Sequence, residues 1–85
     1  MKTYELINLG SSILKDSRIL SSRIDSEIIL SHIMGVPREK LLIDEQYIKP
    51  EKIKKFKSLI IRRSKKEPIA YITKVKEFRR INFLI

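Results

Sequence analysis

Three prolines and two glycines divide this 85-residue sequence into short segments whose apolar residues recur at helical spacing. Pro37 and Pro50 suit the first turn of a helix, because proline has a helical φ and lacks only an amide hydrogen that would have no partner there. Gly35 suits the position after a helix, where a left-handed conformation closes many helices. Together with the apolar spacing, these residues predict helices at about 3–15, 22–34, 37–44 and 50–64, and Pro68 then opens a brief helical turn.

The segment at 22–34 is expected to be the central and most buried helix. Its large apolar residues cover most of its circumference and leave a narrow polar strip near Asp25 and His32; the apolar residues are Ile24, Ile28, Ile29, Leu30, Ile33 and Met34. Ser22 is expected to cap the first turn, with Asp25 three residues on, as in a capping box. Elsewhere, Gly10 is expected to let another helix approach closely, and Leu41 and Leu42 are expected to point inward.

A chain of 85 residues has room for one small domain and not for a second core. The sequence therefore predicts an all-α fold, a small bundle of about five helices over residues 1–73. In residues 74–85 the helical spacing ends, and Ile81, Phe83 and Ile85 alternate with their neighbours in a weak strand pattern. This last segment is expected to be extended.

The formal net charge of +9 has three explanations between which charge alone does not choose: a nucleic-acid partner, an acidic protein partner, or the general composition of a lysine-rich proteome. No apolar segment approaches the roughly 20 residues that a membrane helix needs, so no membrane partner is expected. Glu5 and Asn8 interrupt the apolar residues near the N-terminus, which therefore lacks the core of a secretory signal. A cytoplasmic location is expected by default.

The sequence offers no catalytic or metal-binding constellation. It has no cysteine and one histidine, His32, so no cluster of thiolates or imidazoles can hold a metal ion. Its two glycines, Gly10 and Gly35, stand too far apart to form a phosphate-binding loop. We therefore expect no catalytic, cofactor-binding or metal-ligating residue in this chain.

Basic residues dominate the segment at 50–64, and helical spacing places Lys54, Lys55 and Arg62 on its outer side. These three residues are predicted to contact an acidic partner, whereas Arg63 lies next to the apolar stripe and is predicted to form an internal ion pair. Two interpretations of the basic face stay open: a binding surface, and a solvated face whose lysine stems cover apolar surface. Nucleic acid is possible but not favoured, because few aromatic residues are present to stack on bases.

The residues at the end of this segment and beyond it carry the most specific pattern in the chain. The order Leu59 to Arg63, Glu67 to Ile72, Glu77-Phe78 and Phe83 resembles the end of the N-terminal domain of the HemK/PrmC family. Upstream, residues 22–42 (SRIDSEIILSHIMGVPREKLL) resemble that family's Asp-x-Glu helix, followed by a glycine and an Arg-x-x-Leu-Leu segment. Enzymes of the family are protein-(glutamine-N5) methyltransferases that modify the Gly-Gly-Gln glutamine of peptide chain release factors.

The resemblance implies that this chain works with a methyltransferase domain that is absent from it, in cis or in trans. Residues 1–73 would form the release-factor-recognition domain, and residues 74–85 would begin a β-hairpin linker. The chain alone would then be inactive, and S-adenosylmethionine would bind the absent domain. Glu77, Phe78 and Phe83 would dock against that domain.

Two alternatives to this interpretation stay open. One is a free-standing basic helical module that binds nucleic acid. The other is a non-functional truncated remnant. Lys74 and Arg80 favour it, because they stand where the family usually has glycine and a larger residue in a tight turn has a steric cost. Under this alternative the hairpin is expected to be incomplete or reshaped. Under each interpretation, Tyr71 is expected to pack its ring on the bundle.

Overall fold

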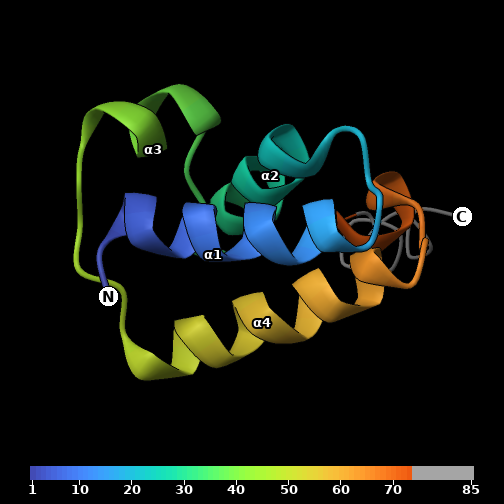
Figure 1. Ribbon diagram of the computed structural model, residues 1–85. Helices are drawn as coiled ribbons and strands as arrows, with labels where there is room; N and C mark the ends of the chain where they lie inside the picture. The colour runs from blue at the N-terminus through green and yellow to red at the C-terminus, as the bar shows by residue number, and fades with distance from the viewer. Residues whose placement is uncertain (74–85) are drawn as a thin grey trace, which may run out of the picture.

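The computed structural model describes residues 1–73, and every regular element in that range is a helix (Figure 1). The helices are α1 (Thr3–Asp16), α2 (Ser22–Met34), α3 (Arg38–Ile43) and α4 (Pro50–Ser64), and residues 69–73 are helical as well. The β pairing in the described range is one isolated bridge between Lys2 and Tyr47. The predicted all-α bundle of about five helices is confirmed, while the hairpin predicted for residues 74–85 lies outside the described residues.

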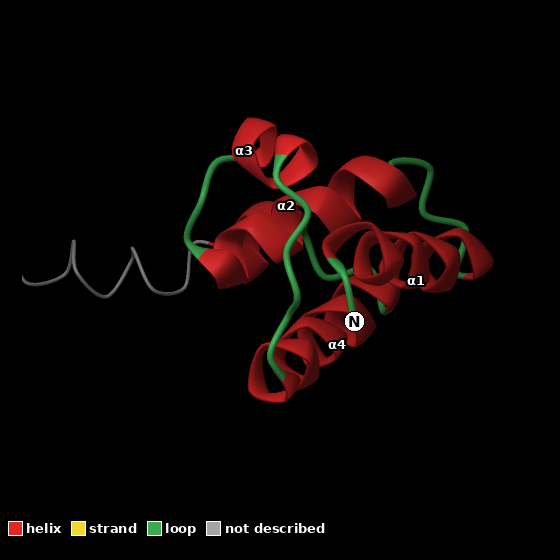
Figure 2. Cartoon of the chain, turned by 90° about the vertical axis from the view of Figure 1, so that its left-hand side faces the viewer, coloured by secondary structure: helices red, strands yellow, loops and turns green. Residues whose placement is uncertain are grey.

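Three helices pack around one another, and α3 covers one end of them. α1 and α4 run side by side in the same direction, and α2 runs in roughly the opposite direction (Figure 1). Each of these three helices contacts the other two. α3 contacts α1 and α2, and short loops join the helices (Figure 2). Because α1 and α2 each contact three other helices, the central position predicted for α2 is shared with α1.

The core is built from one apolar stripe of each long helix. Its largest fully buried side chains are Leu6, Ile7 and Leu14 of α1, Ile29 and Leu30 of α2, and Phe56 and Ile60 of α4. Removing each such side chain from water contributes about 1.5–3 kcal/mol to folding. The short α3 adds Leu41, and the helical turn at 69–73 adds Ile72.

The first turn of α2 differs from the prediction. Ser21, not Ser22, is the N-cap residue, and its Oγ donates to Oδ2 of Asp25 at 2.9 Å instead of accepting from a backbone amide. Ile24 is half exposed, whereas the consecutive polar residues Asp25, Ser26 and Glu27 are buried, and His32 is partly buried. The helix therefore turns polar side chains inward here, which requires partners on the neighbouring helices.

The helix ends follow the local sequence signals closely. Pro50 is the first residue of α4, and Gly35 closes α2 with a φ of 72°. Pro37 is the N-cap of α3, which begins one residue later than predicted. Leu41 is buried as predicted. The prediction for Leu42 was wrong: α3 packs on the bundle along one side only, so the residue after Leu41 points away from the core and is half exposed.

Gly10 lies where α1, α2 and α4 approach one another. A Cβ atom built there would come within 2.5 Å of Oγ of Ser26, 2.6 Å of Cζ of Phe56 and 2.9 Å of Cδ1 of Ile60. The predicted close approach of a second helix is confirmed.

Replacing Gly10 with alanine is therefore expected to destabilise the domain. Overpacking costs about 1–3 kcal/mol and sometimes more, and three simultaneous overlaps place this site at the upper end. That cost exceeds the gain of about 1 kcal/mol from the higher helix propensity of alanine. Urea unfolding followed by circular dichroism measures the net change, and the exposed Ser12→Ala in the same helix is the control. A Gly10→Ala domain as stable as the parent would contradict this packing.

Candidate functional site

Two sequence segments nearly 40 residues apart meet through Asp25 and Arg63. Nε of Arg63 donates to Oδ2 of Asp25 at 2.9 Å, and the side chains are 18% and 5% exposed, respectively. Nη1 of Arg63 also donates to the backbone oxygen of Glu67 at 2.8 Å, and Ser21 donates to the same Asp25 oxygen. The predicted internal ion pair of Arg63 is confirmed, and it joins the start of α2 to the end of α4.

The two polar residues after Asp25 hold α2 to the remaining helices. Oγ of Ser26 donates to the backbone oxygen of Ile7 in α1 at 2.8 Å. The buried carboxylate of Glu27 forms ion pairs with Arg23 at 3.1 Å and with Arg38 of α3 at 3.4 Å. Consecutive side chains thus tie α2 to α4, α1 and α3, and every buried side-chain nitrogen or oxygen in residues 1–73 has a partner. The Asp-x-Glu pattern is a structural feature of the bundle.

Arg62 and Glu67 form a second, more exposed ion pair beside the first. Nε of Arg62 donates to Oε1 at 3.0 Å, and Nη2 donates to Oε2. This paired hydrogen bonding holds the pKa of Glu67 below its usual range. Since the folded-state pKa is lowered, the carboxylate contributes stability above its ordinary titration range and loses that contribution as the pH falls through the lowered pKa.

The four ion pairs described above use arginine and not lysine. Two lysines instead donate to carbonyls at helix ends, Lys52 to Ile33 of α2 and Lys66 to Ser17 after α1. Such contacts satisfy carbonyls that have no partner within their own helix, and the positive charge suits the helix dipole. These two lysines therefore have structural roles.

Lys54 and Lys55 differ from these residues, because both are exposed on α4 and neither has an ion pair or side-chain hydrogen bond within the described residues. Arg62, predicted to share their role, is 40% exposed but already bound to Glu67. The aromatic residue of α4, Phe56, is fully buried. The outer face of α4 therefore offers positive charge without a ring to stack on a base.

The remaining predicted residues are Tyr71 and the three residues expected to dock against a methyltransferase domain. Glu77, Phe78 and Phe83 lie outside the described residues. Tyr71 is 65% exposed, so the prediction that its ring packs on the bundle was wrong; Ile72 occupies the inward position of that helical turn.

Within residues 1–73, no group of acidic or histidine side chains is arranged to hold a metal ion, and no helix is both long and apolar enough to cross a bilayer.

Comparison with known proteins gives a consistent result. Residues 5–73 match the family described as PrmC N-terminal domain. The chain is 41% identical over 68 residues to a bifunctional methyltransferase of Rickettsia conorii, an alignment that covers 79% of the chain and 13% of the relative. It is 32% identical over 81 residues to a release factor glutamine methyltransferase of Leptospira interrogans, covering 94% of the chain and 28% of the relative. A release factor glutamine methyltransferase of Buchnera aphidicola is 38% identical over 71 residues, covering 82% and 26%. The chain thus spans between 13% and 28% of the length of these relatives.

Proposed function

The chain belongs to the PrmC N-terminal domain family, and from this premise we propose that it is the release-factor-recognition domain of a protein-(glutamine-N5) methyltransferase. In this proposal the chain binds a peptide chain release factor, and a methyltransferase domain, in cis or in trans, modifies the glutamine of the Gly-Gly-Gln sequence. The names of the relatives from Leptospira and Buchnera support the substrate class.

The observation that carries the proposal is a difference between two sets of basic side chains: some form ion pairs within the domain, and others have no ionic partner among the described residues. Arg63 and Arg38 are engaged by buried carboxylates, whereas Lys54 and Lys55 face outward without an ionic partner in the described range. Charges that stabilise nothing within the domain are available to an acidic surface on the release factor, where they would steer association. Arg62 would join them through the part of its guanidinium that Glu67 leaves open.

S-adenosylmethionine belongs to the methyltransferase domain in this proposal. Gly10 is packed between helices and Gly35 closes α2, so within residues 1–73 neither glycine belongs to a glycine-rich cofactor-binding loop. Residues 1–73 therefore bind the protein substrate and leave the chemistry to the other domain.

Reversing the charge of Lys54 and Lys55 together is expected to weaken binding of a purified release factor by about tenfold or more. Two lost contacts of roughly 0.7 kcal/mol each, within the range measured for exposed ion pairs, correspond to that factor. Titration calorimetry at low salt measures the affinity, and circular dichroism checks that the fold is kept.

A matched double variant, Lys15→Glu with Lys40→Glu, changes the net charge equally on α1 and α3, where both residues are exposed. It should bind within about twofold of the parent if α4 provides the contact. Equal weakening by both double variants would show that binding depends on the net charge of the chain and not on α4. Unchanged binding of both variants would show that Lys54 and Lys55 do not contact the release factor. Tight, salt-dependent binding of single-stranded RNA without affinity for a release factor would favour the nucleic-acid alternative.

A further inference from the structure

The loop that joins α1 to α2 and the turn that follows α4 lie at the same end of the bundle (Figure 1). The ammonium group of Lys66 in that turn donates to the backbone oxygen of Ser17 in the loop, so the two segments are held together. We name this region the loop end and define it by residues 16–27 and 62–67.

Two basic residues of the loop end have an unfavourable backbone conformation. Arg18 has a φ of 65° and Lys66 a φ of 75°, in the left-handed region where glycine is the usual residue after a helix. Lys66 has a structural role, because its ammonium group holds Ser17. The exposed side chain of Arg18 has no ion pair or hydrogen bond among residues 1–73. A strained residue whose side chain stabilises nothing within the domain is a candidate for binding.

Leu20, two residues after Arg18, is completely exposed, whereas the adjacent Ile19 is buried in the core. Ile24, in the first turn of α2, is half exposed. Apolar side chains gain free energy when a partner removes them from water. The loop end therefore combines an exposed apolar side chain with an arginine that makes no contact within the described domain.

The loop end is positively charged when every ionisable side chain within it is counted. Residues 16–27 and 62–67 hold six basic and four acidic residues, which gives a net charge of +2. Three of the four carboxylates, those of Asp25, Glu27 and Glu67, are already paired with arginines. An acidic partner would therefore be attracted to the loop end, and a basic one would be repelled.

The basic face of α4 continues into the loop end. Lys54 and Lys65 are both exposed and stand about three helical turns apart, so they lie on the same side of α4. Lys65 is the C-cap residue of α4 and adjoins Lys66, which contacts the loop after α1. One acidic surface could therefore span α4 and the loop end together.

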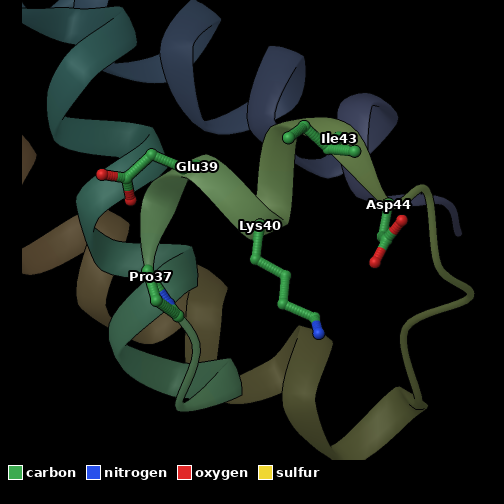
Figure 3. Close-up of a pocket in the computed structure, with 5 residues that line it drawn as sticks. All are labelled: Pro37, Glu39, Lys40, Ile43 and Asp44. Atoms are coloured by element: carbon green, nitrogen blue, oxygen red, sulfur yellow. The ribbon is translucent and has the colours of Figure 1, made fainter.

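The end of the bundle near α3 differs from the loop end in its charge. An open hollow of about 610 Å³ lies there, and its lining includes Glu39 and Asp44 beside Lys40 (Figure 3). Since both signs of charge line the hollow, charge does not select a partner for it. Ile43, which also lines the hollow, is 79% exposed and so provides a matched apolar control for Leu20.

We propose that the loop end is part of the surface that binds the release factor, with Leu20 as an apolar anchor and Arg18 as the contact to a neighbouring carboxylate. This inference rests on the proposed function and specifies the chemistry of the partner surface. That surface is acidic and carries an apolar side chain that covers Leu20. Its acidic part extends along α4 to Lys54.

The test measures the affinity of single variants of the 85-residue chain for a purified peptide chain release factor by titration calorimetry. Leu20→Ser is expected to weaken binding by about fivefold or more, because a partly covered leucine contributes at least that factor. This loss should persist at high salt, since an apolar contact is not screened. Ile43→Ser should bind as the parent does.

Arg18→Gly is expected to change binding and stability in opposite directions. Glycine adopts a positive φ without a steric cost, so the midpoint of urea unfolding should rise. Binding should weaken by about threefold at low salt, within the range for an exposed ion pair, and by less at high salt. An Arg18 with a structural role alone would give the higher midpoint with unchanged affinity.

The outcomes separate this inference from the proposed function. Unchanged affinity of both Leu20→Ser and Arg18→Gly, with the parent still bound to the release factor, would overturn the inference and leave the proposed function in place. Equal weakening by Leu20→Ser and Ile43→Ser would also overturn it, because the loop end would then not be distinguished. No binding by the folded parent would overturn both. Circular dichroism verifies that each variant is folded.

Discussion

Replacing Arg63 with methionine is expected to lower the free energy of unfolding by about 3–5 kcal/mol, since removing one partner of a buried ion pair leaves an uncompensated charge. The Asp25 side chain is 5% exposed, and among residues 1–73 it would keep the hydroxyl of Ser21 as its hydrogen-bond partner. Methionine preserves much of the apolar stem, so the loss reports on the charge and its hydrogen bonds. Urea unfolding at neutral pH, followed by circular dichroism, measures it.

The adjacent Arg62→Met variant is the control for this measurement. Its partner Glu67 is considerably more exposed than Asp25, and water can replace the lost arginine. Arg62→Met should therefore lose far less stability than Arg63→Met. Similar losses in the two variants would show that the stability of the bundle does not depend on the pairing of Asp25 with Arg63.

Truncation of Leu30 to alanine is the second large effect, with an expected loss of about 2–5 kcal/mol. Leu30 is fully buried in α2, which contacts α1, α3 and α4, so the cavity would open at the centre of the bundle. Ile24→Ala in the same helix is the matched control, because Ile24 is half exposed and should lose about 1 kcal/mol or less. Both values come from the same urea titrations, and comparable losses at the two positions would refute the placement of α2.

Together these effects assign different roles to the charged residues of the chain. Asp25, Glu27 and Arg63, which lie in the sequence patterns that resemble the HemK/PrmC family, stabilise the contacts between helices. Lys54 and Lys55 make no such contact within the described residues. A substitution in the first set should therefore destabilise the domain, while one in the second set should leave its stability nearly unchanged and alter what the domain binds.

The helix ends were predictable because they depend on neighbouring residues. Pro50 fixes a helical φ at the first position of α4, and Gly35 adopts a left-handed conformation that other residues avoid. The ion pair of Arg63 was predictable too, because the residue borders the apolar stripe of α4. These features required no knowledge of how the helices pack.

Other features depend on packing and could not be predicted from the sequence. Apolar residues cover most of α2, so their spacing along the sequence could not show which side faces the other helices. In the structure Ile24 is half exposed, and Asp25, Ser26 and Glu27 are buried. The pairing of Arg62 with Glu67 follows from a turn in which Lys66 has a positive φ of 75°, which is uncommon for lysine.

The most direct test of the proposed function is a calorimetric titration of the purified 85-residue chain with a peptide chain release factor. Saturable binding that weakens as salt is added is the expected result, because exposed lysines on α4 would provide part of the attraction. The absence of binding even at low salt, from a chain that circular dichroism shows to be folded, would contradict the assignment of this domain to release-factor recognition.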